Sequence, residues 1–482
     1  MAVAAVAIVS MVLLMLGGVS QVYTARDTQP DKGMSMMGSV EDYDPLVDLS
    51  VTVEITAVRY LEETLSSSFF GGVSGADSTH NFYVKVFIND EEYTSNVWPD
   101  TNYVYDTWTA TCDIPDDQAE VSVTIQLWDM QNDTIPCDLS GDPADHDVEL
   151  TYDVRTGKWT GDDDIEDASG YGRLCGTDDD TIYTADNDCE LWFDIYQNDY
   201  DGDGIPYWME TYEYDTNPQV KDDGDGDGDG IPVAWEHRWG YDPFAYDEHE
   251  QLDPDGDSIN NYEEYRTSAW LSDPYRKDVF VELDMMEDGP NGEKVYFPPH
   301  AEELLNTAFD RQNVMFHLDY GDMGGHELIP FDELSTRREL DGVYNDYFLH
   351  GDEDNWRQGV FHYGVITYNV DSAPGWCFRC DAFQLASLGM EDLTRYGFLE
   401  RDIIYASGYM HELGHTFDFF PIPGHSQRSQ YPWQIGYWVN RPYKSCMNYG
   451  WVYTLVDYSD GSRILPDIDD WERIEYDAFE PD

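Results

Sequence analysis

The sequence predicts a multidomain protein with an N-terminal antiparallel β-sandwich, a spacer of calcium-loop repeats, and a C-terminal domain of the α/β (α+β) class. Three observations predict this order: apolar residues alternate through the first part, an Asp-rich motif repeats in the middle, and strands alternate with helices in the last part. The length of 482 residues also suits about three domains of roughly 150 residues each. We divide the chain into residues 1–25, 26–46, 47–197, 198–275 and 276–482.

The first segment, residues 1–25, predicts export from the cytoplasm. Ala2 to Val22 contains no charged residue and is long enough for a membrane helix or for the core of a signal peptide. A cleaved signal peptide and a retained membrane anchor both stay open. Either one predicts a protein that is extracellular or anchored at the cell surface through its N-terminus. Residues 26–46 are polar, contain Pro and Gly, and predict a linker.

Residues 47–197 predict the sandwich, because apolar and polar residues alternate in four separate runs. These runs are 49–55, 82–88, 121–127 and 191–195, and clusters of Gly, Asn and Asp separate them. The segments Asn81 to Ile88 and Ile125 to Asp129 resemble the calcium- and lipid-binding sandwich of the synaptotagmin type, and the resemblance covers most of this region.

Residues 198–275 contain three copies of a calcium-loop motif, with Asp at positions 1, 3 and 5 and Glu at position 12. Alternate Asp side chains can surround a hard cation, and the final Glu closes its coordination shell. The copies are Asp199, Asp201, Asp203, Gly204 and Glu210; Asp225, Asp227, Asp229, Gly230 and Glu236; and Asp253, Asp255, Asp257, Ser258 and Glu264.

The motif departs from a true EF-hand in two ways. Ile directly follows position 6 in each copy, one place early, and Ser258 stands where the other two copies have Gly. The copies resemble thrombospondin type 3 repeats, which share an EF-hand-like loop. This resemblance implies structural Ca²⁺ and a stiff spacer rather than a calcium switch.

Charge and composition exclude two classes of protein. Asp and Glu number 99 against 25 Lys and Arg, so the formal net charge is −74. Such a surface repels phosphate backbones, which excludes a nucleic-acid partner. Hydrophobic residues make up 41% of the chain and aromatic residues 15%, which excludes a disordered acidic chain. Of the seven cysteines, Cys377 and Cys380 predict a local disulfide.

Residues 276–482 predict an α/β domain, with strands at 279–283, 314–318 and 360–370 and a helix at 301–309. A second helix is expected from Glu400 to Phe420, because apolar residues recur there at spacings of three and four. On it, His411 and His415 lie one turn apart with Glu412 between them. Two imidazoles at this spacing can bind one zinc ion, and the carboxylate can accept a proton from water.

The His-Glu-x-x-His pattern is expected by chance only roughly 0.02 times in a chain of this composition. With Met447 and Tyr449, which follow the helix, it resembles the metzincin zinc peptidases. The resemblance implies Zn²⁺ as cofactor, a protein or peptide as substrate, and Glu412 as general base. It also implies that Met447 lies under the metal and that Tyr449 is an extra ligand or an oxyanion stabiliser.

The third zinc ligand departs from that family. Metzincins have Gly three residues and His six residues after the second His, whereas this chain has Asp418 and Pro421 at those places. Pro cannot bind zinc. We expect His425 to be the third ligand, because the intervening Pro and Gly residues can turn the chain back toward the helix. Asp418 is the rival.

Two functions follow from these observations. The first is a secreted or cell-surface zinc-dependent endopeptidase, a hydrolase of peptide bonds that calcium stabilises. The alternative is a calcium-dependent surface or adhesion protein whose protease-like domain is inactive. The intact His411, Glu412 and His415 favour the first function, and the altered spacing of the third ligand favours the second.

Overall fold

The computed structural model describes residues 42–61, 79–130, 136–140, 146–163, 171–176, 187–222, 224–370, 374–395 and 400–478. Residues 43–482 form one compact unit. The predicted signal peptide or anchor and most of the predicted linker lie outside the described residues. In the described part of the chain, no helix has the length and apolar character needed to cross a bilayer.

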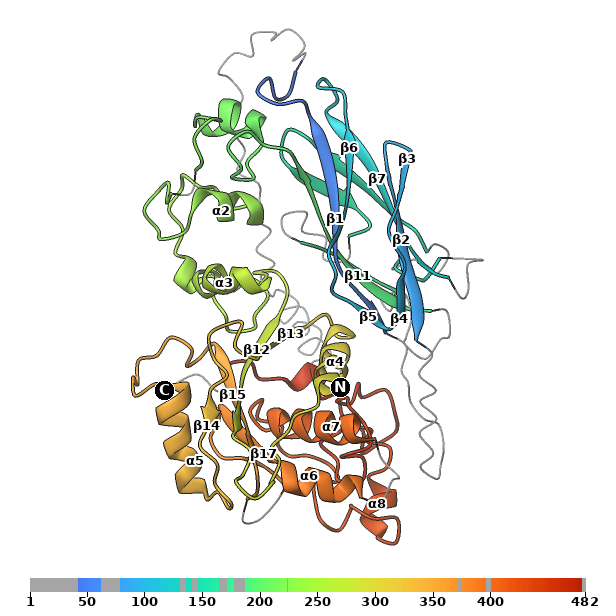
Figure 1. The fold of residues 1–482 in the computed structure, drawn as a ribbon, viewed down its shortest axis with the longest axis vertical. Helices are drawn as coiled ribbons and strands as arrows, with labels where there is room; N and C mark the ends of the chain where they lie inside the picture. The colour runs from blue at the N-terminus through green and yellow to red at the C-terminus, as the bar shows by residue number, and fades with distance from the viewer. Residues whose placement is uncertain are drawn as a thin grey trace, which may run out of the picture. The chain divides into compact units, whose positions relative to one another are not determined.

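The N-terminal region folds as two antiparallel sheets (Figure 1). One has the strand order β10-β11-β1-β5, with β6 also paired to β1, and the other has the order β3-β2-β7-β8-β9, with β4 also paired to β2. The strands are β1 (Ser50–Tyr60), β2 (His80–Ile88), β3 (Glu91–Thr94), β4 (Trp98–Thr101), β5 (Tyr103–Val104), β6 (Trp108–Asp113), β7 (Glu120–Asp129), β8 (Val148–Asp153), β9 (Lys158–Gly161), β10 (Gly172–Cys175) and β11 (Cys189–Gln197).

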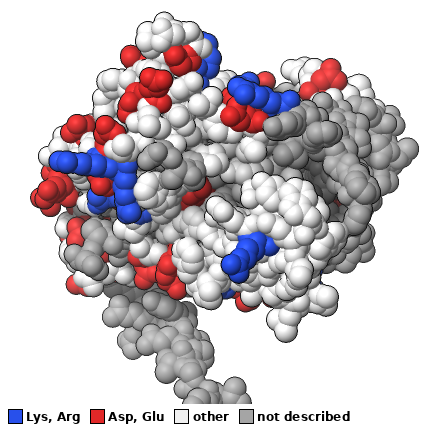
Figure 2. All heavy atoms as spheres, turned by 90° about the horizontal axis from the view of Figure 1, so that it is seen from below, with Lys and Arg blue, Asp and Glu red and all other residues white. Residues whose placement is uncertain are grey.

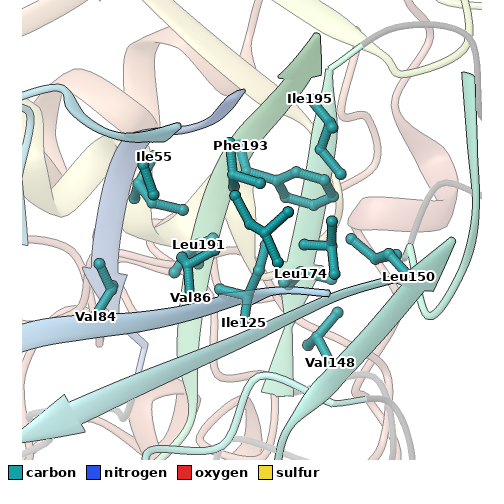
Figure 3. Packing of buried hydrophobic residues seen from close by; sticks show 14 of the residues in the cluster. Ile55, Val84, Val86, Ile125, Val148, Leu150, Leu174, Leu191, Phe193 and Ile195 are labelled. Atoms are coloured by element: carbon teal, nitrogen blue, oxygen red, sulfur yellow. The ribbon is translucent and has the colours of Figure 1, made fainter. Parts of the chain in front are cut away.

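The apolar faces of the two sheets form one core, and Figure 3 shows their side chains pointing toward one another. Ile55 and Phe193 come from the first sheet, and Val86 and Ile125 come from the second. The four predicted runs of alternation correspond to β1, β2, β7 and β11. The prediction of an N-terminal antiparallel sandwich is therefore confirmed.

The spacer consists of the three Asp-rich loops and short helical segments around a small aromatic core. The segments are the π-helix η2 (Met209–Tyr214), α2 (Val233–Trp239), the 3-10 helix η3 (His249–Gln251), α3 (Asn261–Thr267) and the 3-10 helix η4 (Ser268–Trp270). Ile231, Trp235 and Trp239 form the buried core, and tyrosines pack around it. The spacer thus has an apolar core of its own between the loops.

The C-terminal region is built on a mostly parallel sheet of order β13-β12-β15-β17-β16, in which β16 is antiparallel and β14 pairs with β12. Its strands are β12 (Asp278–Met286), β13 (Met315–Asp319), β14 (Leu328–Ile329), β15 (Phe361–Thr367), β16 (Gly375–Cys377) and β17 (Ala382–Ala386). Its helices are α4 (Pro299–Asp310), α5 (Arg337–Val343), η5 (Tyr344–Phe348), α6 (Ser387–Thr394), α7 (Arg401–Gly414), α8 (Ile435–Val439) and η6 (Trp471–Arg473).

Helices cover both faces of this sheet. Residues of α4 and α7 pack with Val281 on one face, and residues of α5 and η5 pack with Phe280 on the other. The helix predicted for residues 400–420 is shorter than expected, because α7 ends at Gly414. Phe417 continues the apolar spacing, and its side chain is buried in the core. It lies in a turn after the helix and not in the helix itself.

The charged residues fall into two groups, one exposed and one buried. On the face drawn in Figure 2, Asp and Glu lie in several separate clusters with uncharged areas between them.

Inside the molecule, charged residues join the sandwich to the α/β region: Arg173 Nε donates to Glu190 Oε1 at 2.5 Å and Arg276 pairs with Asp310 at 3.2 Å. Arg59 also pairs with Asp310. This buried network links β1, β10 and β11 to α4.

The predicted disulfide between Cys377 and Cys380 does not form, and both residues are free thiols. Cys377 Sγ donates to the carbonyl oxygen of Arg379 at 2.9 Å. The local turn therefore brings the thiol of Cys377 to the backbone rather than to the second sulfur.

Candidate metal centres

The first candidate centre lies at the C-terminal end of α7, a helix that is buried on nearly all sides from Ile404 to Gly414. His411 is in its last turn and His415 directly follows its last residue. His411 Nδ1 lies 2.8 Å from the carbonyl oxygen of Cys446, which fixes Nδ1 as the donor. The lone pair of Nε2 on His411 is therefore directed into the site, as metal-binding imidazoles require.

His425 reaches the same place from the loop after α7. Gly424 precedes it with a φ of 76°, a left-handed conformation that suits glycine, and its α-carbon packs tightly against the side chain of Asn448. The Nε2 atoms of His425 and His411 are 3.3 Å apart. His411, His415 and His425 form a group whose ligand atoms all lie within 4.8 Å of one another.

These distances fit zinc. Zinc–nitrogen bonds of 2.0–2.1 Å in tetrahedral geometry place two ligand nitrogens about 3.3 Å apart. Asp418, the rival third ligand, is exposed and lies outside this group, with a φ of 53° in the left-handed region. The three-imidazole group therefore contains His425 and not Asp418.

The three imidazoles are neutral at pH 7. Burial lowers the pKa of His411 to about 3 and that of His415 to about 2, and neighbouring imidazoles add to both shifts. Burial also lowers the pKa of His425. Neutral imidazoles keep the lone pairs that a metal ion needs, so the site is ready to bind without losing protons.

Glu412 is the acid–base group of this centre. Its side chain is buried, and burial raises the pKa of its carboxyl to about 8, although the backbone of Cys377 acts in the opposite direction. A group that titrates near neutral pH can both accept and return a proton. Its carboxylate packs against Gly375 of β16, where a larger residue would collide with it.

Met447 and Tyr449 both lie close to the end of α7 and its imidazoles. Met447 is fully buried, and its Sδ would lie 2.6 Å from a β-carbon added at Gly414, so it packs directly behind the end of α7. The Tyr449 ring lies 4.4 Å from that of His425, centre to centre. Burial, with the charge of Glu412, raises the pKa of Tyr449, so its hydroxyl stays a donor at neutral pH.

The sheet ends beside this centre. Among the described strands, β16 pairs only with β17, and the backbone of Cys377 in β16 hydrogen-bonds to the carboxylate of Glu412. Since Glu412 packs against Gly375 of β16, this strand runs past the acid–base group. An extended chain that paired with β16 would therefore pass beside Glu412.

We call the three Asp-rich loops loop 1 (residues 199–210), loop 2 (225–236) and loop 3 (253–264). All three share two internal hydrogen bonds. The first Asp accepts from the backbone N–H of position 6 at 3.0–3.2 Å, and the third Asp accepts from position 7 at 2.7–3.0 Å. Ser258, at position 6 of loop 3, has a φ of 73° and so shares the left-handed region with Gly204 (87°) and Gly230 (101°) of the other loops. Serine therefore builds the same turn.

Each loop closes on a buried Glu. Glu210 and Glu236 are fully buried and Glu264 is 1% exposed. Burial raises the pKa of Glu210 to about 8 and that of Glu236 to about 7, with the neighbouring Asp charges adding to the shift. Carboxylates crowded in this way are stabilised by a bound cation, and a hard ion with several oxygen ligands fits best.

One further acidic residue approaches each loop, and sequence analysis missed all three. The backbone N–H groups of Asp222, Asp247 and Asp278 donate to the third Asp of loops 1, 2 and 3 at 2.8, 3.4 and 2.6 Å. Each lies well beyond the 12-residue motif, so the motif itself could not reveal it. Only the recurrence of an Asp after each loop could have been a signal.

Comparisons with known proteins give matches among solved structures. No family model matches the chain, and no curated protein matches it. Solved structures that match include the C2A and C2B domains of Extended-Synaptotagmin 2 (11% identity, TM-score 0.18, 31% of this chain and 39% of that one). A C2 domain (11%, 0.16, 31% and 98%) and the C2A domain of plant Extended Synaptotagmin 1 (11%, 0.17, 30% and 92%) also match. This chain thus covers well under two thirds of the first of these structures.

These findings correct the family assignments made from sequence. The prediction that the chain is a metzincin with thrombospondin type 3 repeats is wrong, because no family model matches the chain. The assignment to a metalloprotease family and the Met-turn description that followed from it are wrong for the same reason. The physical reason is that the assignment rested on a few residues. The His-Glu-x-x-His segment and one methionine determine local geometry but not the surrounding fold.

Proposed function

We propose that the chain is a metal-dependent hydrolase whose centre consists of His411, His415 and His425, with Glu412 as the general base. The observation that carries the proposal is the convergence of the three imidazoles, with two Nε2 atoms 3.3 Å apart and an acid–base carboxyl beside them. When bound, Zn²⁺ would supply a Lewis acid and lower the pKa of a water molecule toward 7.

The residues around that ion have separate roles in the proposal. Glu412 takes the proton from the attacking water and returns it to the leaving group, which its pKa near neutrality allows. Tyr449 can donate a hydrogen bond to the oxygen on which negative charge develops. Cys446 holds the His411 ring in the tautomer that presents Nε2.

A peptide is the substrate class that this geometry favours. The edge of β16 lies beside Glu412 and offers backbone groups to an extended chain. We place the protein outside the cytoplasm or at the cell surface, in agreement with the uncharged N-terminal segment of residues 2–22. The calcium loops would stabilise it there.

The test compares Glu412→Gln with Asp402→Asn, a control in the first turn of the same helix. Glu412→Gln should keep zinc but lower the rate of casein digestion by about 10²- to 10⁴-fold, because the amide cannot accept the proton. Asp402→Asn should leave both zinc content and rate near the wild-type values. His425→Ala should release zinc, whereas Asp418→Ala should not.

The second candidate function is a calcium-dependent surface protein with no hydrolytic activity. Three loops with buried carboxylates and the sandwich favour it, and the names of the matching structures fit this function better than the first. Wild-type protein loaded with zinc and calcium that cleaves nothing in a broad peptide library would refute the hydrolase and favour this second function.

A further inference from the structure

Loop 2 differs from the other two loops because an imidazole reaches into it. His249 lies in η3, outside the 12-residue motif, and its side chain is 1% exposed. Its Nε2 is 3.1 Å from Oδ2 of Asp229 and 3.8 Å from Oε1 of Glu236. Asp229, Glu236 and His249 form a group whose ligand atoms all lie within 4.8 Å of one another.

The buried carboxylate in this group accepts no hydrogen bond in the described structure, and His249 Nε2 lies 3.8 Å from its Oε1. Glu236 is fully buried, yet neither of its side-chain oxygens has a hydrogen-bond partner. A buried carboxylate left in this state is costly, and a cation between Glu236, Asp229 and His249 would remove the cost. The unsatisfied oxygens are therefore an independent sign of a bound ion, beyond the cluster of acids itself.

The surroundings hold the His249 ring in place. Trp235 and Tyr241 contact it edge to face, with ring centres 5.9 and 5.0 Å away. Its Nδ1 is 3.1 Å from the side-chain amide of Asn261, and the amide oxygen of that fully buried residue has no partner. When the amide turns its oxygen to Nδ1, Nδ1 becomes the donor and Nε2 presents its lone pair to the carboxylates.

Among the described residues, the ligand groups at loop 1 contain carboxylates only, and at loop 3 the nearby imidazole of His317 is 2.5 Å from the carboxylate of Asp278. The residues that approach them from outside the motif are Asp222 and Asp278, and no imidazole belongs to the group Asp203, Glu210 and Asp222 at loop 1. Calcium prefers oxygen ligands, whereas an imidazole nitrogen favours transition-metal ions such as Zn²⁺. The chemical difference between the loops is thus one of ligand type, not of fold.

We propose that loop 2 is a transition-metal site, in which Asp229, Glu236 and His249 bind an ion such as Zn²⁺ while loops 1 and 3 bind Ca²⁺. Asp225 and Asp227 lie in the same loop and can complete the coordination shell. Asn261 acts as a positioning residue, since it touches the imidazole and not the ion.

The test measures bound metals on the full-length chain after equilibration with Zn²⁺ and excess Ca²⁺ and removal of free ions. Wild type should carry two zinc ions, one at loop 2 and one at the α7 centre, and two calcium ions. His249→Gln should carry one zinc ion fewer. The matched control is His237→Gln, which removes another buried imidazole of the spacer. The Nδ1 atom of His237 lies 2.8 Å from the hydroxyl of Tyr214. The His237→Gln protein should keep both zinc ions.

The loop 2 proposal and the hydrolase proposal fail in different ways. If the α7 centre binds no zinc, wild type should carry one zinc ion that His249→Gln removes and His415→Ala keeps, and loop 2 stands. If wild type carries three calcium ions, and His249→Gln leaves its zinc content unchanged, the loop 2 proposal is overturned.

A second measurement avoids any variant that could unfold the spacer. His415→Ala lacks a ligand of the α7 centre, so its remaining zinc ion should be at loop 2. X-ray absorption of this protein should show one imidazole nitrogen among oxygen ligands. A protein that holds no zinc, or zinc with oxygen ligands alone, would contradict the assignment.

Discussion

Glu210 in loop 1 should destabilise the calcium-free protein and stabilise the calcium-bound one. Its side chain is fully buried, its Oε2 has no hydrogen-bond partner, and Oε1 accepts only from the Thr216 hydroxyl at 3.4 Å. Burial, with the charges of Asp203 and Asp201, raises the pKa of Glu210 to about 8 from its ordinary value of 4.5. The folded, calcium-free chain therefore keeps a proton that the unfolded chain has lost.

The sign and size of the effect follow from this difference. Between pH 4.5 and 8 the folded state binds more protons than the unfolded state, so the stability of the calcium-free protein falls as pH rises through this window. At 1.36 kcal/mol per pKa unit, Glu210 alone should remove about 2.5 kcal/mol between pH 5 and pH 7. Bound Ca²⁺ cancels this loss, because it stabilises the ionised carboxylate.

Glu210→Gln should therefore have opposite effects in chelator and in calcium. In chelator at pH 7 it should slow hydrogen exchange of backbone amides in residues 205–214 by roughly 300-fold, the equivalent of about 3.4 kcal/mol. In excess calcium the same substitution should speed exchange, since loop 1 loses the ligand that closes its shell. Glu213→Gln, an exposed neighbour in η2, is the control and should change neither rate. Equal exchange in wild type and Glu210→Gln in chelator would refute the reasoning.

Three further predictions concern the rest of the molecule. Gly414→Ala should cost about 1–3 kcal/mol in thermal unfolding, because its new methyl group would lie 2.6 Å from Met447 Sδ. Arg173→Met should cost about 1.5–3 kcal/mol, since the buried carboxylate of Glu190 loses its donor at 2.5 Å and keeps Arg59 at 3.3 Å. Arg155→Met at a partly exposed pair should cost under about 1 kcal/mol. Burial lowers the pKa of His362 to about 3, so this residue should remove about 2 kcal/mol from the free energy of unfolding as pH falls from 7 to 5. In calorimetry, His362→Gln should make the free energy of unfolding less dependent on pH over this range.

The elements that could be predicted from sequence are those that a local pattern determines. Alternation places β1, β2, β7 and β11, because one buried face per strand imposes a period of two. The Asp pattern places the three loops, because each turn depends on side chains a few residues apart. The order of strands in the sheets has no such local signal, so the position of β16 at the edge beside Glu412 could not be predicted.

The end of α7 and the role of His249 were missed for a related reason. Apolar spacing continues to Phe417, but burial of that ring does not require a helix, and the chain leaves helical geometry after Gly414. His249 enters loop 2 because Trp235 and Tyr241 pack around its ring. Such tertiary contacts leave no periodic mark in the sequence.

Loop 3 has a direct physical connection to the sheet that carries the α7 centre. Asp278 is the first residue of β12, its backbone N–H donates to Asp257 at 2.6 Å, and its carboxylate lies 2.5 Å from Nε2 of His317 in β13. β12 pairs with both β13 and β15, so Asp278 joins loop 3 to the middle of the sheet. Loop 1 meets Asp222 instead, which lies within the spacer. Loss of calcium from loop 3 therefore removes a constraint on the strand next to β15, whereas loss from loop 1 acts only on the spacer.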